Sequence, residues 1–370
     1  DNKKAVSHSN VIMIIVPKMI DEKKKPDYSY VEKSCKDVGM GLKQGSLVIF
    51  ASTVGPGITE TLVKETLENT SGLKAGVDFC LVNSATRAAP GQIMQDLVSY
   101  PRVVGAIDDQ SFRTASLFFG TFVKSGVVRV HDMRTAEMVK LFENVYRDVS
   151  LALSNELSLS CEKLKADYLE VQAAANTQPY CHLLRPGIVA GHIPKDPYLL
   201  LEEAENAGAK LGMVALARRI NDEMLDHAIQ LVKDVLGERQ RPFKRAKVAL
   251  LGVSYRANIK EPRGTAVIQL AKLFAAKGAI VRVFDPLYSY NELREIGLPA
   301  ERTLEKAVEG ADCLVIVVGH NRFNHLSLKK LKLLMTKSAS IVDMGNTIQP
   351  EKAEKAGFVY RGVGRTVRMT

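Results

Sequence analysis

Short apolar runs rich in β-branched residues alternate with amphipathic stretches along the first third of the chain. The apolar runs are typical of buried parallel strands and cover residues 11–16, 47–51, 77–82, 103–107 and 127–130. The stretches between them have a helical period and cover residues 29–42, 59–67 and 112–123. This alternation predicts a doubly wound α/β sheet.

The pattern changes near residue 135. Residues 135–164 contain neither proline nor glycine, which predicts one helix roughly three times the mean length. Further helical stretches follow at residues 197–207 and 215–236, and the polar, basic stretch 237–247 is typical of a linker.

Strand and helix alternation then restarts in the last third. The apolar runs there are residues 248–251, 280–284, 314–318 and 340–342. We therefore predict an α/β protein with two doubly wound parallel-sheet domains joined by a long-helix core. We place the three domains at residues 1–132, 133–238 and 247–370.

Composition agrees with a globular protein of more than one domain, because 370 residues exceed what one hydrophobic core usually organises. The five cysteines form no CxxC pair, so neither a disulfide framework nor a metal site is indicated. Without a bilayer-length apolar run or a signal-peptide pattern, we expect no membrane segment and a cytoplasmic location.

The charge balance favours anionic partners, since 51 basic minus 41 acidic residues leaves +10. The basic stretch Arg239 to Lys247 raises nucleic-acid binding as one alternative. However, the chain has no recognised nucleic-acid module, no tryptophan and only 6% aromatic residues for base stacking. We therefore expect no nucleic-acid partner.

Candidate chemistry begins on the long helix, where one face carries Glu137, Lys140, Asn144, Arg147 and Asp148. A lysine and an asparagine one turn apart can jointly hold a water molecule or an oxyanion. Because such stripes are often merely solvated, a cleft and a solvated face both remain open for this helix.

Two loops and one turn are further candidates. The loop 185–198 is rich in glycine and proline and carries His192 and Asp196, and the loop 252–263 carries two arginines suited to a phosphate or carboxylate. The chain has no GxGxxG motif, and the turn 53–57 is its nearest phosphate-type turn. For each of the three segments, an ordinary turn or a solvated loop without a ligand remains the alternative to a binding site.

Motifs spread over nearly the whole chain occur in the order of one known family. They include VIMIIVP at 11–17, the STV segment at 52–54, TAEMVK at 135–140, DPY at 196–198 and GVGR at 362–365. The chain resembles the UDP-glucose/GDP-mannose dehydrogenase family, and most closely its branch that oxidises UDP-N-acetylmannosamine and related sugars.

The resemblance implies an NAD-dependent homodimer that oxidises the C6 alcohol of a UDP-sugar to the uronate, as in polysaccharide biosynthesis. It implies three domains: a partial NAD-binding domain, a helical central dimerisation domain with an active-site loop, and a UDP-sugar-binding domain. The first and the last of these are expected to be Rossmann-like. The N-terminal domain lacks its first βαβ unit with the glycine-rich turn, and we expect two βα units of about 30 residues each to restore it.

The resemblance also assigns site residues, with no metal among them. The implied catalytic residues are Lys140, Asn144, Asp196 and His192. The implied substrate-binding residues are Arg87, Arg147, Gly191, Tyr255 and Arg256. The implied cofactor-binding residues are Val16, Pro17, Ser52, Thr53, Pro194, Lys195 and Arg263.

The chain departs from the family pattern where the chemistry is demanding. The nucleophilic cysteine that follows the loop histidine is missing, because His192 runs directly into Ile193. A substrate-binding glutamate is replaced by Thr86, and two arginines are replaced by Tyr180 and Gly345. Ser150 also stands where the acetamido-sugar branch usually has asparagine.

These departures leave enzymatic competence open. The alternative is a catalytically impaired member or fragment that binds nucleotide sugar without completing the oxidation, or that removes one hydride and stops at the aldehyde. Cys181 could replace the lost thiol only if the loop were remodelled, because it lies eleven residues before His192.

Overall fold

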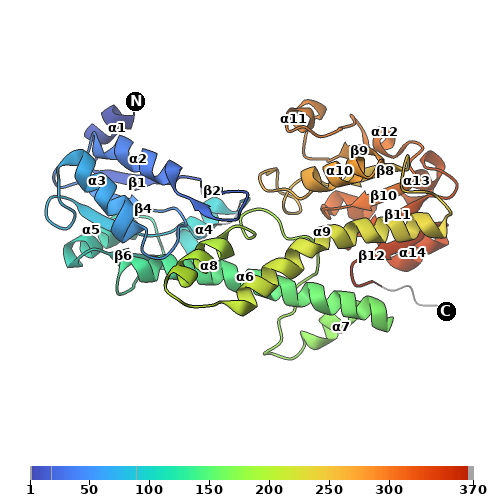
Figure 1. Cartoon of the computed structure of the whole chain (residues 1–370), viewed down its shortest axis with the longest axis horizontal. Helices are drawn as coiled ribbons and strands as arrows, with labels where there is room; N and C mark the ends of the chain where they lie inside the picture. The colour runs from blue at the N-terminus through green and yellow to red at the C-terminus, as the bar shows by residue number, and fades with distance from the viewer. Residues whose placement is uncertain (1, 18, 89, 366–370) are drawn as a thin grey trace. The chain divides into compact units, whose positions relative to one another are not determined.

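Two units with separate cores make up the structure, which is a computed structural model describing residues 2–17, 19–88 and 90–365. The outer limits 1 and 370 of the expected domains lie outside the described residues. Unit 1 comprises Asp1–Arg147 with Lys195–Ala215, and unit 2 comprises Asp148–Pro194 with Leu216–Thr370. Each unit contains one of the predicted sheets, which confirms the α/β fold class (Figure 1).

The sheet of unit 1 has the strand order β1-β4-β5-β6-β7 in the described residues. Its strands are β1 (Val11–Ile14), β4 (Leu47–Phe50), β5 (Cys80–Asn83), β6 (Arg102–Ala106) and β7 (Val127–Arg129). A short hairpin, β2 (Met19–Ile20) and β3 (Pro26–Asp27), follows β1 and was not predicted.

Helices cover both faces of this sheet. One face packs on α2 (Ser29–Gly39) and α3 (Lys64–Ser71), and the other packs on α5 (Asp109–Gly120). The remaining helices of the unit are α1 (Asn2–Ser7), the π-helical turn η1 (Thr59–Val63), α4 (Ile93–Ser99) and α8 (Asp196–Asn206).

Two sequence predictions in this sheet need correction. The strand expected at 77–82 begins at Cys80, because Asp78 accepts a hydrogen bond from the Lys74 N–H and holds the preceding residues in a turn. In addition, β6 runs antiparallel to β5, pairing Val82 with Ala106, so this sheet is mixed rather than wholly parallel. The connection contains the seven-residue helix α4, and β6 starts at the carboxyl edge, where β5 ends.

The sheet of unit 2 is parallel throughout, in the order β12-β11-β10-β8-β9. Its strands are β8 (Lys247–Leu251), β9 (Ile280–Phe284), β10 (Cys313–Ile316), β11 (Ser340–Asp343) and β12 (Val359–Gly362). Read in chain order, this is the doubly wound order 2-1-3-4-5, whose topological switch point lies between β8 and β10.

Helices cover this second sheet on both faces as well. One face packs on α10 (Val267–Ala276) and α11 (Tyr290–Glu295), and the other packs on α12 (Leu304–Val308), the 3-10 helix η2 (Asn321–His325), α13 (Leu328–Leu334) and α14 (Pro350–Lys355). The short helix α7 (Tyr168–Ala175) also belongs to this unit. The long helices α6 (Met133–Leu164) and α9 (Gly212–Glu238) each contribute to both units. No described helix is long and apolar enough to cross a membrane.

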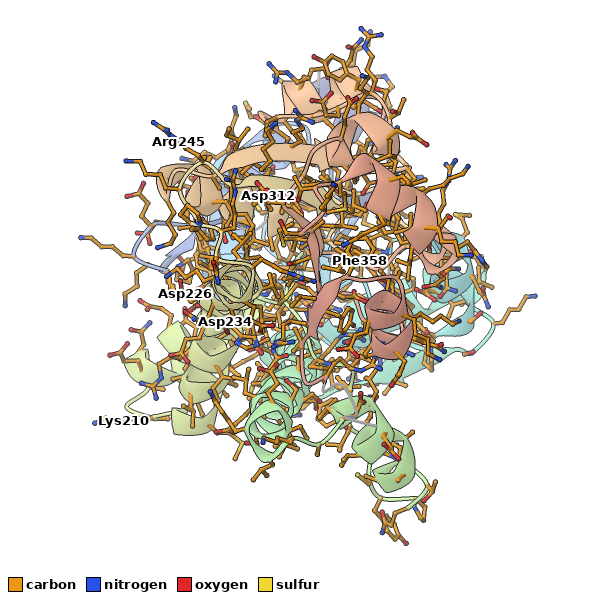
Figure 2. The ribbon with its side chains drawn as sticks, turned by 90° about the vertical axis from the view of Figure 1, so that its right-hand side faces the viewer. Lys210, Asp226, Asp234, Arg245, Asp312 and Phe358 are labelled. Atoms are coloured by element: carbon orange, nitrogen blue, oxygen red, sulfur yellow. The ribbon has the colours of Figure 1, made fainter. Side chains whose placement is uncertain are left out.

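The long helix α6 was predicted almost to the residue. Its start is fixed by Asp132, whose side chain accepts a hydrogen bond from the Thr135 N–H at 2.7 Å. The basic stretch after α9 forms turns that end at β8, where Asp312 accepts the Lys247 N–H and pairs with Arg241. Arg245 of this stretch projects outward (Figure 2).

A buried carboxylate explains why the helix predicted at 59–67 begins with a π-helical turn. Glu137 of α6 accepts hydrogen bonds from the Gly57 N–H (2.5 Å), the Thr59 N–H (2.8 Å) and the Thr59 hydroxyl (2.6 Å). It thereby satisfies donors that open the turn and anchors it to α6. Burial nevertheless raises the pKa of Glu137 to about 7, because these hydrogen bonds offset only part of the desolvation.

We predict that Glu137 makes folding stability depend on pH. An unfolded glutamate has the ordinary pKa of 4.5 and loses its proton near that pH, whereas Glu137 in the folded protein has a pKa of about 7. The contribution of Glu137 to the free energy of unfolding is therefore largest below pH 4.5 and is lost as the pH rises to about 7. The measurement is the free energy of unfolding of the wild type minus that of Glu137→Gln, obtained from urea unfolding between pH 4.5 and 8.

The difference should fall as the pH rises, by up to about 1.4 kcal/mol for each unit of pKa shift. Glu65→Gln, at an exposed carboxylate of α3, is the control and should show no such trend. A wild-type minus Glu137→Gln difference that stays constant over this range would contradict the prediction.

Candidate functional site

The predicted cofactor residues of the first α/β unit meet at the carboxyl edge of its sheet. Ser52 is buried, and its hydroxyl accepts a hydrogen bond from the Val16 N–H (2.7 Å) and donates one to the Val16 carbonyl (3.1 Å). These bonds hold the loop after β1 against the loop after β4, with Pro17 and Thr53 next in sequence. Open α/β sheets bind ligands at this edge.

The polar face of α6 forms a second part of the same unit. Asn144 donates a hydrogen bond from its side-chain amide to the carboxylate of Asp196, which is fully buried at the first residue of α8. Lys140 lies one helical turn before Asn144 and is 17% exposed at its side chain. The structure thus brings three of the predicted catalytic residues to one region. Arg147, two turns along α6, is exposed.

A carboxylate missed by the sequence analysis joins this region. Glu143 pairs through one oxygen with Arg87 (2.5 Å), and its other oxygen lies 4.0 Å from the Lys140 ammonium. Arg87 also donates a hydrogen bond to the Pro101 carbonyl at 3.1 Å, so two partners fix its guanidinium. The signal was present in the sequence, because Glu143 lies three residues after Lys140 on a predicted helix.

Unit 2 contains a separate, buried polar network that fixes the loop before Gly191. Asp148 is fully buried and pairs with Arg218 at 2.5 Å, and Asn221 donates hydrogen bonds to both the carbonyl and the carboxylate of Asp148. Asn155 connects this pair to the loop, since its side chain binds Asn221 and both the N–H and the carbonyl of Gly187. The network therefore anchors the backbone of this loop at Gly187.

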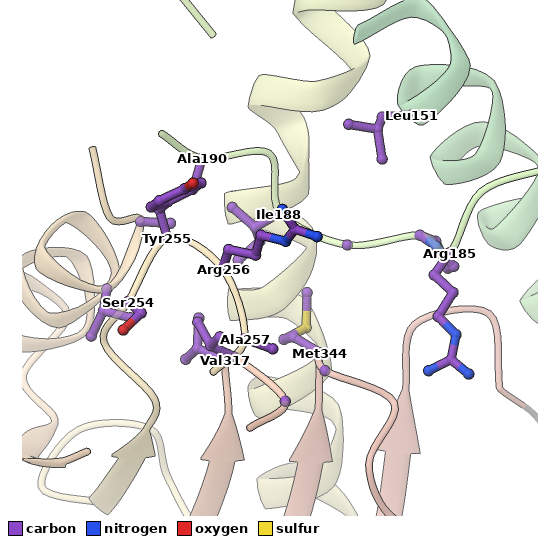
Figure 3. A pocket seen from close by; sticks show the side chains of 17 residues that line it. Leu151, Arg185, Ile188, Ala190, Ser254, Tyr255, Arg256, Ala257, Val317 and Met344 are labelled. Atoms are coloured by element: carbon purple, nitrogen blue, oxygen red, sulfur yellow. The ribbon is translucent and has the colours of Figure 1, made fainter. Parts of the chain in front are cut away.

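This loop forms one wall of a pocket of about 290 Å³ at the carboxyl edge of the second sheet (Figure 3). The other walls are the segments that follow β8, β10 and β11, so the pocket lies at the topological switch point of the sheet. Tyr255 and Arg256, both predicted, line it, and so does Arg185, which the prediction missed. No acidic residue is among the residues that line it, which makes the pocket strongly cationic.

Gly191 lies against Tyr255, as expected for two residues of one site. Its N–H donates a hydrogen bond to the Gly264 carbonyl at 3.0 Å, and a Cβ at position 191 would lie 2.6 Å from the Tyr255 ring. Its φ of 78° favours glycine as well. Arg263, a predicted cofactor residue, is exposed and pairs with Glu261 of its own loop at 2.6 Å.

The other predicted loop residues lie on the path to α8. His192 is exposed, and its charge helps to lower the pKa of Glu261, after the larger effect of Arg263. Pro194, the last residue of a segment of unit 2, and Lys195, the first residue of the following segment of unit 1, are both half-buried. The five cysteines are all free, and the two buried ones, Cys35 and Cys313, have pKa values raised by burial.

In the described part of the chain, no group of three or more histidine, cysteine or acidic side chains is placed to hold a metal ion. The geometry therefore consists of a cofactor-type edge with a Lys140–Asn144–Asp196 cluster in unit 1 and a cationic pocket in unit 2.

Family models match the chain in three consecutive segments. They describe the UDP-glucose/GDP-mannose dehydrogenase family: its NAD binding domain at residues 1–123, its central domain at 134–223 and its UDP binding domain at 249–350. The NAD-binding match confirms NAD as the cofactor predicted from the sequence.

Individual relatives point to the same family as the family models. The chain is 35% identical over 369 residues to the UDP-N-acetyl-D-mannosamine dehydrogenase of Pyrococcus horikoshii, covering 99% of this chain and 83% of that protein. It is 30% identical to the UDP-N-acetyl-D-glucosamine 6-dehydrogenase of Pseudomonas aeruginosa, covering 95% and 84%.

A solved structure of UDP-D-ManNAc dehydrogenase from Pyrococcus horikoshii superposes with a TM-score of 0.88 at 33% identity, covering 98% of this chain and 83% of that one. With all three domains present in order and an alignment over nearly its whole length, the chain belongs to the UDP-glucose/GDP-mannose dehydrogenase family.

Proposed function

We propose that this protein oxidises the C6 alcohol of a UDP-sugar to the uronate with two NAD, and that UDP-N-acetylmannosamine is its substrate. The observation that carries the proposal is the Lys140–Asn144–Asp196 cluster, located in the same unit as the cofactor edge. The substrate choice rests on the relatives that act on UDP-N-acetyl-D-mannosamine, led by the 35% identical protein of Pyrococcus horikoshii.

The edge of the first sheet suits the nicotinamide end of NAD. Val16 and Ser52 are fixed there, with Pro17 and Thr53 beside them. Asn83, which ends β5 at the same edge, has a buried amide oxygen with no hydrogen-bond partner among the described residues. Such an oxygen is an acceptor available to a bound group. When bound, NAD supplies the hydride acceptor.

The chain's own residues position the substrate oxygen and a water molecule. Lys140 and Asn144 would donate hydrogen bonds to the C6 oxygen, stabilising negative charge that develops as its proton leaves. Asp196 orients the Asn144 amide by accepting its hydrogen bond, and is a candidate to hold the attacking water.

Water addition replaces a covalent thioester in this proposal, because Ile193 follows His192 directly and no thiol is placed in that loop. The alcohol loses a hydride and a proton to give the aldehyde, and water adds to give its hydrate. The hydrate then loses a second hydride and a proton to give the carboxylic acid. In total, one sugar and one water give one uronic acid, two hydrides that are transferred and two protons that are released.

The pocket of unit 2 is proposed to hold the UDP group. Arg185 and Arg256 reach it from different loops, and both suit a diphosphate, which arginine binds through paired N–H groups (Figure 3). Arg185 also supplies a cation near Gly345, where the family pattern has an arginine.

A homodimer is proposed from the surface of α6. The part of α6 that belongs to unit 2 leaves three large apolar side chains exposed, Leu153, Leu157 and Leu164. Apolar surface gathered on one element marks an interaction site, and a second copy of this chain is the occupant we propose.

We predict that the wild type sediments at twice its chain mass and that Leu153→Asp shifts it toward the monomer, because a carboxylate would be desolvated in the interface. Leu117→Asp, at an exposed leucine of α5, is the control and should leave the mass unchanged. A wild type that is monomeric at tens of micromolar, a concentration at which an interface of about 1,600 Å² is normally occupied, would contradict the homodimer.

We predict that Arg185→Ala and Arg256→Ala each weaken UDP binding about tenfold, because each removes a charged hydrogen-bond donor to the diphosphate. Isothermal titration calorimetry with UDP measures the change. Arg245→Ala removes an outward arginine of the same unit and should leave the affinity unchanged. Equal losses in all three variants would mean that only the overall charge matters, contrary to the proposed pocket.

The proposed reaction predicts two NADH for each UDP-N-acetylmannosamine, measured at 340 nm with excess NAD and the full-length natural polypeptide. Lys140→Met and Asn144→Ala should lower kcat by roughly a hundredfold or more, since each removes a donor to the reacting oxygen. One NADH with aldehyde accumulating would limit the protein to the first oxidation. No NADH while UDP-sugar still binds would refute the reaction and favour a binding protein without catalysis.

A further inference from the structure

The carboxylate of Glu143 connects two cations that come from different elements. One oxygen pairs with Arg87, from the loop after β5, at 2.5 Å, and the other faces Lys140 of α6 at 4.0 Å. The loop from Ser84 to Arg87 carries no acidic residue of its own. The negative charge that faces Arg87 is therefore supplied by the helix.

The location of this pair matters more than its contribution to stability. Its side chains are 30% and 35% exposed, and ion pairs of that exposure contribute about 0–1 kcal/mol to folding. However, Glu143 lies directly before Asn144, whose amide is fixed by Asp196. Arg87 is fixed a second time by the Pro101 carbonyl. Two interacting pairs, Arg87 with Glu143 and Asp196 with Asn144, therefore meet at adjacent positions of α6.

We propose that Glu143 is a positioning residue for the oxidation, holding Lys140 and Arg87 in the geometry that receives the sugar. This inference rests on the proposed function. Both carboxylate oxygens of Glu143 face cations of the cluster, so Glu143 is placed to hold those side chains rather than to contact the reacting atoms. It acts through Lys140, whose ammonium must point at the C6 oxygen, and through Arg87.

Charge balance supports this role. Arg87 and Lys140 carry two positive charges, and Glu143 and Asp196 carry two negative charges, so the cluster is neutral with Glu143 present. Replacing Glu143 by glutamine leaves a net charge of +1 and two cations without their shared anion. Like charges that share a partly buried site repel each other, which would move Lys140 away from its position.

The first test is steady-state kinetics of Glu143→Gln, Glu143→Asp and Glu65→Gln with UDP-N-acetylmannosamine. We expect Glu143→Gln to lower kcat by about tenfold to a hundredfold, the range for a reacting group that is slightly misplaced, with a smaller rise in KM because Arg87 also loses its partner. Glu143→Asp should restore part of the loss because it keeps the charge. Glu65→Gln, at an exposed carboxylate of the same unit, should match the wild type.

The second test does not depend on activity. Amide hydrogen exchange of residues 84–88, measured by mass spectrometry, should be severalfold faster in Glu143→Gln than in the wild type or Glu65→Gln, because the Arg87 loop loses an anchor. This measurement remains informative if the wild type forms no NADH, a result that would overturn the proposed function itself.

Two results would overturn the inference while the proposed function stands. One is a kcat for Glu143→Gln equal to that of the wild type. The other is a raised KM with unchanged kcat, which would make Glu143 a residue of uniform substrate binding. If the wild type is inactive, unchanged exchange at residues 84–88 in Glu143→Gln would overturn the inference as well.

Discussion

The buried charge of Asp148 is the constraint on which unit 2 depends. Burial raises the pKa of this carboxyl, and Arg218 opposes that rise from 2.5 Å away. Removing one partner of such a buried pair typically costs about 3–5 kcal/mol, because the other charge is left without compensation. The same carboxylate binds Asn221, which binds Asn155, which holds both polar groups of Gly187. One wall of the pocket in unit 2 is thus fixed by a charged residue, Asp148, that does not line the pocket.

Much of this architecture was predictable because it depends on local patterns. The helix α6 follows from thirty residues without glycine or proline and a capping Asp132, and the buried parallel strands follow from continuous apolar runs. The reversal of β6 was not predictable, because a run of apolar residues does not encode its direction. The π-helical turn at Thr59 depends on Glu137, which lies 78 residues away in sequence. Contacts of this kind leave no periodic signal.

The residues of the site likewise include some that the sequence predicts and some that it does not. Lys140, Asn144 and Asp196 could be named from motifs, but the partners that orient them could not. Glu143 was not among the residues of the predicted polar stripe, and Arg185 entered only as the first residue of the predicted loop 185–198. The role proposed for each residue depends on its neighbours in the fold. Glu143 faces Arg87, and Arg185 lies at the carboxyl edge of the second sheet.

The departures from the family pattern are also easier to interpret in three dimensions. A Cβ at Gly345 would lie 2.6 Å from the Gly319 N atom, so the backbone there packs too closely for any side chain without a shift. The missing arginine is therefore accommodated by the local backbone, and the pocket keeps two other arginines and no acid. In unit 1, Thr86 removes a carboxylate of the family pattern, yet Arg87 beside it still faces an acidic side chain, Glu143, whose other oxygen faces Lys140. The charged groups of the α6 cluster therefore remain paired despite that departure.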